Sequence, residues 1–100
     1  MNTGIIASSR LRGEKEFIFD DNGTIKFVGT TVGFTQEVNG VTYTTVDDTT
    51  IRNYDPDTDD FTVLCTTLCT NISILFQSSS FNQNINNWDV SNVTTLSGLF

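Results

Sequence analysis

The stretch Cys69–Phe76 reads CTNISILF, and 24 residues later Val93–Phe100 reads VTTLSGLF. Five of the eight positions are identical or exchange one aliphatic side chain for another. Self-similarity at a fixed period is typical of repeat architectures, in which one unit cannot bury its apolar face alone and stacks on its neighbours. The repetition therefore predicts that the two copies stack, and it favours a scaffold or binding surface over a compact enzyme.

Apolar residues inside and around the copies predict how the repeat packs. The spacing of Ile72, Leu75 and Phe76 predicts one face of a short helical turn with Thr70 as its cap, and residues 88–90 are expected to form a short strand. Trp88 and the phenylalanines could also offer a sugar-stacking platform, although their place in the repeat favours core packing. The expected packed and stacking face comprises Ile72, Leu75, Phe76, Phe81, Ile85, Trp88, Val90, Val93, Leu96, Leu99 and Phe100.

Composition and charge narrow the classes of partner. The chain has 100 residues, 37% of them hydrophobic and 17% charged, with a net charge of −7. Polyanions and anionic membranes repel such a chain, so we expect neither nucleic acid nor membrane insertion. No run approaches the roughly 20 apolar residues of a membrane-spanning helix. The opening residues 1–10 carry no basic region ahead of a short apolar run, so no signal peptide is expected.

The first half of the chain divides into an arm and a β-rich module. Residues 1–13 are expected to be either a frayed terminus or an extended anchoring arm that docks on a neighbouring subunit through Ile5, Ile6 and Leu11. Residues 14–46 predict β-structure. Turns are indicated at 21–23, which reads DNG, and at 39–40, which reads NG, because Asn-Gly favours two-residue hairpin turns.

Residues 47–68 are expected to be a lead-in to the repeats at 69–100. Asp47 or Asp48 could cap a short helix over 49–54, and residues 61–64 predict a strand. Between them, Asp55, Asp57 and Asp59 superficially match a calcium loop, but its glycine and glutamate positions are not matched, which favours a hydrated acidic loop.

Catalytic and redox chemistry find little support in this sequence. The chain has no histidine, which excludes Ser-His and Cys-His nucleophile pairs. Asp47/Asp48 and Asp59/Asp60 could in principle serve as an acid–base pair in glycoside chemistry, but adjacent acids in turns are more often caps. Cys65 and Cys69 lack the further ligands of a zinc site and are expected to be two small buried hydrophobes or a disulfide. We therefore expect no enzyme, no cofactor and no metal.

A longer phrase carries a family resemblance. Residues 81–94 read FNQNINNWDVSNVT, and this segment resembles the repeat F-N-Q-D-I-x-x-W-D-V-S-N-V-T of the BspA-like leucine-rich-repeat surface proteins. Asn84 replaces the usual Asp, and Leu96 and Leu99 replace the usual Met residues. The likeness is strong over 69–100 and extends loosely back to residue 41. It implies a strand and a short helix in each repeat, stacking into a solenoid, surface display, and binding in place of catalysis.

We therefore expect a mainly β chain with short helices (α+β), an N-terminal β-hairpin module leading into a leucine-rich-repeat solenoid. Residues 4–9 resemble the N-termini of some tailed-bacteriophage structural proteins. The first functional hypothesis is a non-enzymatic structural or interaction protein on the outside of a virion or similar surface assembly, bound to neighbouring subunits and a host receptor. Further repeats or another chain would cover its C-terminal face. The alternatives are a fragment of a bacterial cell-surface adhesin and, third, a glycan-binding module.

Overall fold

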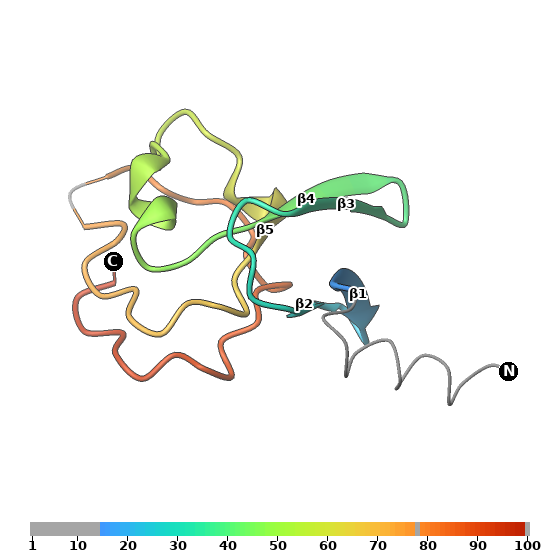
Figure 1. The fold of residues 1–100 in the computed structure, drawn as a ribbon. Helices are drawn as coiled ribbons and strands as arrows, with labels where there is room; N and C mark the ends of the chain where they lie inside the picture. The colour runs from blue at the N-terminus through green and yellow to red at the C-terminus, as the bar shows by residue number, and fades with distance from the viewer. Residues whose placement is uncertain (1–14, 78, 100) are drawn as a thin grey trace, which may run out of the picture.

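The computed structural model describes residues 15–77 and 79–99, and its named elements lie between Phe17 and Cys65 (Figure 1). The predicted arm residues Ile5, Ile6 and Leu11 and the repeat residue Phe100 lie outside the described residues.

The first hairpin forms where the sequence predicts it. Strands β1 (Phe17–Asp21) and β2 (Thr24–Val28) pair antiparallel. The connecting residues Asn22 and Gly23 have φ of 54° and 95°, the positive values of a type I′ turn. β1 turns Ile18, 2% exposed, into the core, whereas its neighbours Phe17 and Phe19 pack against each other with ring centroids 5.6 Å apart.

The second hairpin is also confirmed and extends into a three-stranded sheet. Strands β3 (Thr35–Val38) and β4 (Val41–Thr45) are joined by Asn39 and Gly40, with φ of 54° and 85°. The two-residue strand β5 (Leu64–Cys65) adds to the other edge of β4 in parallel orientation. The parallel pairing brings the chain back alongside itself 20 residues after Thr44.

The predicted short helix is present as a 3₁₀ helix, and a second 3₁₀ helix replaces most of the predicted strand. η1 (Thr50–Asn53) begins where the Asp47 carboxylate accepts hydrogen bonds from the backbone N–H groups of Thr50, at 2.8 Å, and Thr49, at 3.2 Å. η2 (Phe61–Val63) occupies most of the segment predicted as a strand. The Asp60 carboxylate accepts from Thr62 N–H at 2.9 Å, and this local cap favours a turn over an extended chain.

The core consists of two clusters that meet at β5. Successive side chains of a strand point to opposite faces, so Leu64 enters one cluster and Cys65 the other. The first cluster contains Val46, Ile51, Phe61, Leu64, Cys69, Ile72, Phe76 and Trp88. The second contains Ile18, Ile25, Phe27, Tyr43 and Cys65.

Phe61 is the centre of the first cluster. Its ring is 0% exposed and makes edge-on contacts with Phe76 and Phe81, each at a centroid distance of 5.3 Å. The indole N–H of Trp88 donates to the Phe61 carbonyl at 3.0 Å. The hydrogen bond satisfies the buried indole, so Trp88 belongs to the core and not to a sugar-stacking platform.

The expected leucine-rich-repeat solenoid is not formed, and this prediction was wrong. The described residues form a small, mostly β domain with two small sheets and two 3₁₀ turns. Beyond Cys65 the described residues contain no helix or strand, only one isolated β-bridge. Among residues 15–77 and 79–99, no helix has the length and apolar character needed to cross a membrane.

The predicted elements of the repeat fail for local reasons. Leu75 N–H bonds to the Ile72 carbonyl, a single turn of the i→i+3 type, and Ile74 has a φ of 53°, which ends any right-handed helix at that residue. In place of the strand predicted at 88–90, the Asp89 carboxylate accepts from Ser91 N–H at 3.0 Å. Such a side-chain bond to the second following residue turns the chain.

Candidate functional site

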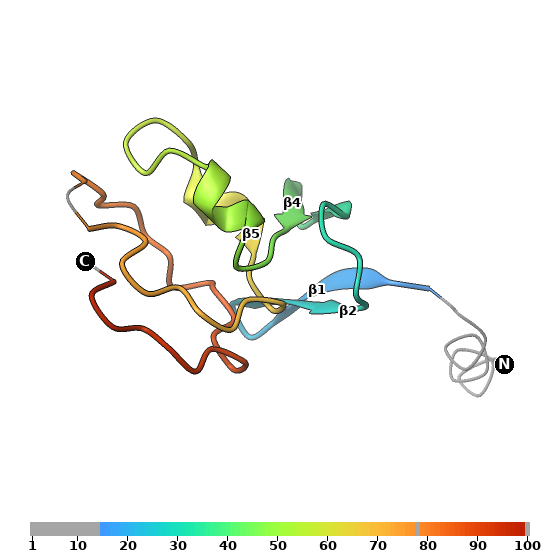
Figure 2. The same cartoon turned by 60° about the vertical axis from the view of Figure 1, so that its left-hand side comes forward.

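The two copies of the repeated phrase lie side by side and run parallel. We call residues 69–77 the first segment and residues 93–99 the second segment. Figure 2 shows them as neighbouring orange and red tubes. Three backbone N–H groups of the first donate to carbonyls of the second at 2.8–3.0 Å: Ile72 to Thr95, Ile74 to Ser97 and Phe76 to Leu99. The predicted juxtaposition of the copies is therefore confirmed, although the solenoid is not.

The register of this pairing matches the repeat in the sequence. Thr94 N–H donates to the carbonyl of Thr70, its counterpart, at 2.8 Å. Ile74 and Gly98 also occupy equivalent positions, and both have positive φ, 53° and 65°. A glycine adopts this conformation without strain, whereas a β-branched residue rarely does. The backbone of the repeat thus holds an isoleucine in a conformation suited to glycine.

The predicted packed face is only partly assembled. Ile72, Phe76 and Trp88 are buried. Five others are half-buried against the same cluster: Leu75, Phe81, Ile85, Val93 and Leu99.

Val90 and Leu96 were wrongly placed in the packed face, since they are 49% and 51% exposed. Ile72 occupies the position of Leu96 in the first segment and is 1% exposed. Figures 1 and 2 draw the second segment at the outer edge of the described chain, which explains the difference. Ile74, which the sequence analysis did not select, is the most exposed of these side chains at 57%.

Asp48 and Arg52 hold the first segment from the other side. The Asp48 carboxylate accepts from the N–H groups of Thr70, at 2.7 Å, and Asn71, at 3.0 Å. The Arg52 guanidinium donates to the carbonyls of Asn71 and Ser73 at 2.9 and 3.0 Å. Partial burial raises the pKa of Asp48, but hydrogen bonds from Asn71 and Thr70 and the charge of Arg52 outweigh it and hold that pKa below its usual value. The sequence analysis considered Asp48 only as a cap for the helix at 49–54, a role that Asp47 fills, and it did not identify Arg52.

The acidic loop uses its carboxylates on its own backbone and on the chain beside it. Asp55 accepts from Asp57 N–H at 2.9 Å, and Asp59 accepts from Asp55 N–H at 2.7 Å. Asp57 reaches across to Ser80 N–H at 2.9 Å. Within residues 15–77 and 79–99, no three His, Cys, Asp or Glu side chains are grouped so that they could hold a metal ion.

The two cysteines are free and buried, so of the two expectations the small buried hydrophobe is confirmed. Their thiols belong to different core clusters. Burial raises the pKa of both, that of Cys69 to about 12. Since the thiolate is the reactive form, neither side chain is suited to redox or nucleophilic chemistry in the folded protein.

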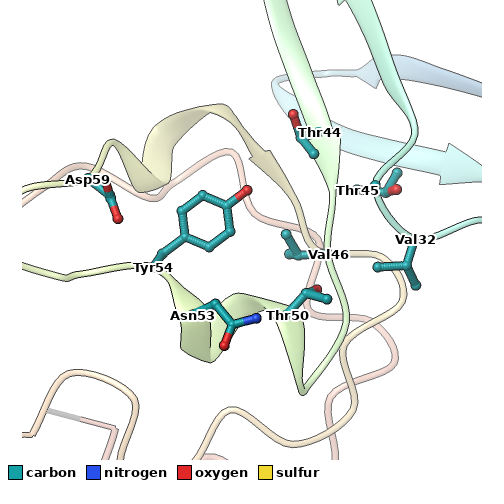
Figure 3. Close-up of a pocket in the computed structure, with 9 residues that line it drawn as sticks. Val32, Thr44, Thr45, Val46, Thr50, Asn53, Tyr54 and Asp59 are labelled. Atoms are coloured by element: carbon teal, nitrogen blue, oxygen red, sulfur yellow. The ribbon is translucent and has the colours of Figure 1, made fainter.

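A shallow hollow of about 380 Å³ lies between β4, η1 and the acidic loop (Figure 3). Tyr54 extends across it, with Asp59 on one side and Val46 on the other. Asn53 lies below the tyrosine, and Thr44 lines the wall formed by β4. The sequence analysis singled out Asp59 in the acidic loop but did not identify this hollow, because its residues come from separate segments with no shared motif.

One family model matches more than half of the chain. It covers residues 44–100, from the second half of β4 through both segments. No curated protein and no solved structure matches the chain. The chain belongs to the family described as Mycoplasma protein of unknown function, DUF285.

Proposed function

We propose that this chain is a non-catalytic interaction module displayed at a cell surface, and that it is related to the BspA-like surface proteins. The family match at 44–100 and the BspA-like phrase at 81–94 coincide in the same part of the chain. The side chains that carry the interaction are those that the paired segments leave outside the core.

The observation that carries the proposal is the state of Ile74. Its side chain is 57% exposed and its backbone is left-handed, a conformation that costs a non-glycine residue roughly 1–2 kcal/mol. Neither burial nor backbone preference accounts for an isoleucine here, since Gly98 occupies the equivalent position at a φ of 65°. Strained backbone conformations cluster at sites that contact ligands, and Ile74, Val90 and Leu96 all expose apolar surface in this part of the chain.

The family description favours a cell over a virus particle, because it names Mycoplasma. Display on a virion stays a prediction that depends on the short likeness at residues 4–9 alone. A host-surface receptor is the partner that fits an exposed apolar contact on an acidic protein, and a receptor with basic residues around an apolar patch matches the net charge of −7.

The test measures binding of the fluorescently labelled chain to intact host cells and compares two variants. The double variant Ile74→Asn/Leu96→Gln removes two exposed apolar side chains from the paired segments, and Asn tolerates the left-handed backbone. Val41→Thr is the matched control, since Val41 is 38% exposed but lies outside the matched family region.

We expect saturable binding that falls at least about 10-fold, or 1.4 kcal/mol, in the double variant and is unchanged in Val41→Thr. Labelling of intact producing cells with an antibody against the chain is expected as well. Equal binding by all three proteins, or an antibody signal only after cells are permeabilised, would contradict the proposal.

A further inference from the structure

The hollow beside Tyr54 combines an apolar floor with polar groups of both hydrogen-bonding kinds. Val46 and Val32 supply apolar surface, and the tyrosine ring lies between Val46 and Asp59 (Figure 3). The ring is fixed from behind by Phe61, whose centroid lies 5.9 Å away at an interplanar angle of 64°. Binding sites for small molecules share this build, an apolar surface with a few placed polar groups.

Two of the hydroxyl groups around the hollow already make hydrogen bonds within the chain. The Thr45 hydroxyl donates to the Thr31 carbonyl at 2.7 Å and accepts from Phe34 N–H at 2.9 Å. The Thr50 hydroxyl donates to the Asp47 carboxylate at 2.9 Å. These bonds tie β4 to the loop at 31–34 and hold the start of η1 on Asp47, so two walls of the hollow are held by the chain itself.

Three other polar groups have no hydrogen bond to any described residue: the phenol of Tyr54, the amide of Asn53 and the hydroxyl of Thr44. A fourth, Asp59, uses one carboxylate oxygen on Asp55 N–H at 2.7 Å, and its other oxygen bonds to no described residue. Together they offer both donors and acceptors around one aromatic ring.

The charge of the hollow excludes an anionic ligand. Its only ionisable acid or base besides the phenol is Asp59, and no lysine or arginine lines it. Arg52, which directly precedes Asn53 on η1, donates instead to the carbonyls of Asn71 and Ser73. The net charge of −7 on the whole chain also repels an anionic ligand.

A cation fits less well than a neutral ligand. An ammonium group only donates, so it would satisfy Asp59 but leave the Asn53 NH₂ without an acceptor. A sugar hydroxyl both donates and accepts, and the C–H face of a pyranose ring matches the face of a tyrosine. We infer that the hollow formed by Asn53, Tyr54, Asp59 and Thr44 binds a neutral sugar ring.

This inference goes beyond the proposed function and is independent of it, because the hollow shares no side chain with Ile74 or Leu96. The sugar titration can therefore succeed even if the cell-binding experiment fails, and the cell-binding experiment can succeed even if the sugar titration fails.

The test is a titration of the isotopically labelled chain, followed by amide chemical shifts, with the methyl glycosides of glucose, galactose, mannose and N-acetylglucosamine. A small open site predicts a Kd of about 1–10 mM for one of these probes. The shifts are expected to be confined to the amides around Asn53, Tyr54 and Asp59.

Two variants remove single groups without removing the ring. Asn53→Ala truncates an exposed side chain, and Tyr54→Phe deletes only the phenol; each is expected to weaken binding at least about 5-fold. Asn82→Ala is the matched control, because Asn82 is also exposed and its amide makes no bond to a described residue.

Three results would overturn the assignment. One is the absence of saturable shifts with all four glycosides up to about 50 mM, well above the expected Kd. The second is binding that survives both Asn53→Ala and Tyr54→Phe, or that is equally lost in Asn82→Ala. The third is a response of the same amides to methylammonium but to none of the sugars, which would assign the hollow to a cation.

Discussion

The first and second segments share one backbone path but differ in what covers them. Ile72 and Leu96 are equivalent in the repeat, yet the first is 1% exposed and the second 51%. Ile74 and Gly98 adopt the same left-handed conformation with different side chains. The comparison shows that the repeated phrase determines the local path of the chain, whereas burial depends on the neighbours on each side.

The two segments are also held by different chemistry on their inner sides. Asp48 supplies side-chain oxygens to the N–H groups of Thr70 and Asn71. The second segment takes a backbone acceptor instead, since Thr94 N–H and Thr95 N–H both point to the Thr70 carbonyl. The Asp48 carboxylate thus does for the first segment what the Thr70 carbonyl does for the second.

The largest expected difference in stability between the segments is the one between the variants Ile72→Ala and Leu96→Ala. Truncating buried Ile72 leaves a cavity in the Phe61 cluster and should lower the free energy of unfolding by about 3 kcal/mol. The same truncation at Leu96 removes a half-exposed side chain and should cost about 1 kcal/mol or less. Urea unfolding followed by Trp88 fluorescence measures both. Similar losses for the two variants would show that the segments are equally covered, contrary to this structure.

The next largest expected difference in stability is between the variants Gly98→Ala and Ile74→Gly. An alanine at position 98 would have to adopt the left-handed backbone of Gly98, and its Cβ would lie 3.1 Å from the Ile74 Cγ2. This substitution should therefore lower the free energy of unfolding by about 1–2 kcal/mol. Ile74→Gly relieves strain but uncovers Gly98, and its net effect should lie within about 0.5 kcal/mol of zero. Thermal unfolding compares the two variants. A large loss in Ile74→Gly would mean that Ile74 is held for stability and not for a partner.

Much of the N-terminal half could be predicted from its turns. Asn22-Gly23 and Asn39-Gly40 carry local backbone preferences strong enough to determine two hairpins. Which face of each strand is buried was harder to predict, since β1 buries Ile18 and leaves its two phenylalanines half-buried. Which face is covered depends on contacts with β3 and β5, which no local pattern encodes.

The repeat was harder to predict because apolar spacing of three and four residues fits both a helix and a run of turns. Ile72 and Phe76 are buried as predicted, but the left-handed Ile74 between them rules out the helix. Aligning the two copies places Gly98 at the position of Ile74, and this glycine was the sequence feature that indicated a left-handed residue there. The hollow beside Tyr54 could not be predicted, because it depends on how η1 packs against β4.

A smaller effect concerns Asp48 and pH. Asp48→Ala removes a carboxylate cap from the first segment and should cost about 1 kcal/mol at pH 7. The pKa of Asp48 is lowered in the folded chain, so its contribution is complete above the ordinary aspartate pKa of about 3.9 and is lost as pH falls through the folded value. The difference in unfolding free energy between wild type and variant should therefore shrink on acidification.

Glu37→Ala is the control for removal of an exposed acid, since the Glu37 carboxylate makes no hydrogen bond to a described residue. Its cost at pH 7 should be smaller than that of Asp48→Ala. A difference between wild type and Asp48→Ala that stays constant from pH 7 to pH 2 would refute a role for the ionised carboxylate.

A further difference between the segments concerns the rate of thiol labelling. Cys69 in the first segment is 0% exposed, and burial raises its pKa to about 12, so alkylation in the native state should be limited by opening of the fold. Val93→Cys places a thiol at the equivalent, half-buried position of the second segment and should be alkylated faster by at least about 10-fold. Mass spectrometry of both peptides gives the rates. Equal rates would mean that the second segment is as well covered as the first.

The central claim is the parallel register of the two segments, and amide-detected NMR of the labelled chain tests it most directly. Cross-hydrogen-bond couplings or backbone proximities are expected from Ile72 N–H to Thr95, from Ile74 N–H to Ser97 and from Phe76 N–H to Leu99, the pairs joined in this structure. Their absence, or a set of contacts shifted by one or more residues, would contradict the account.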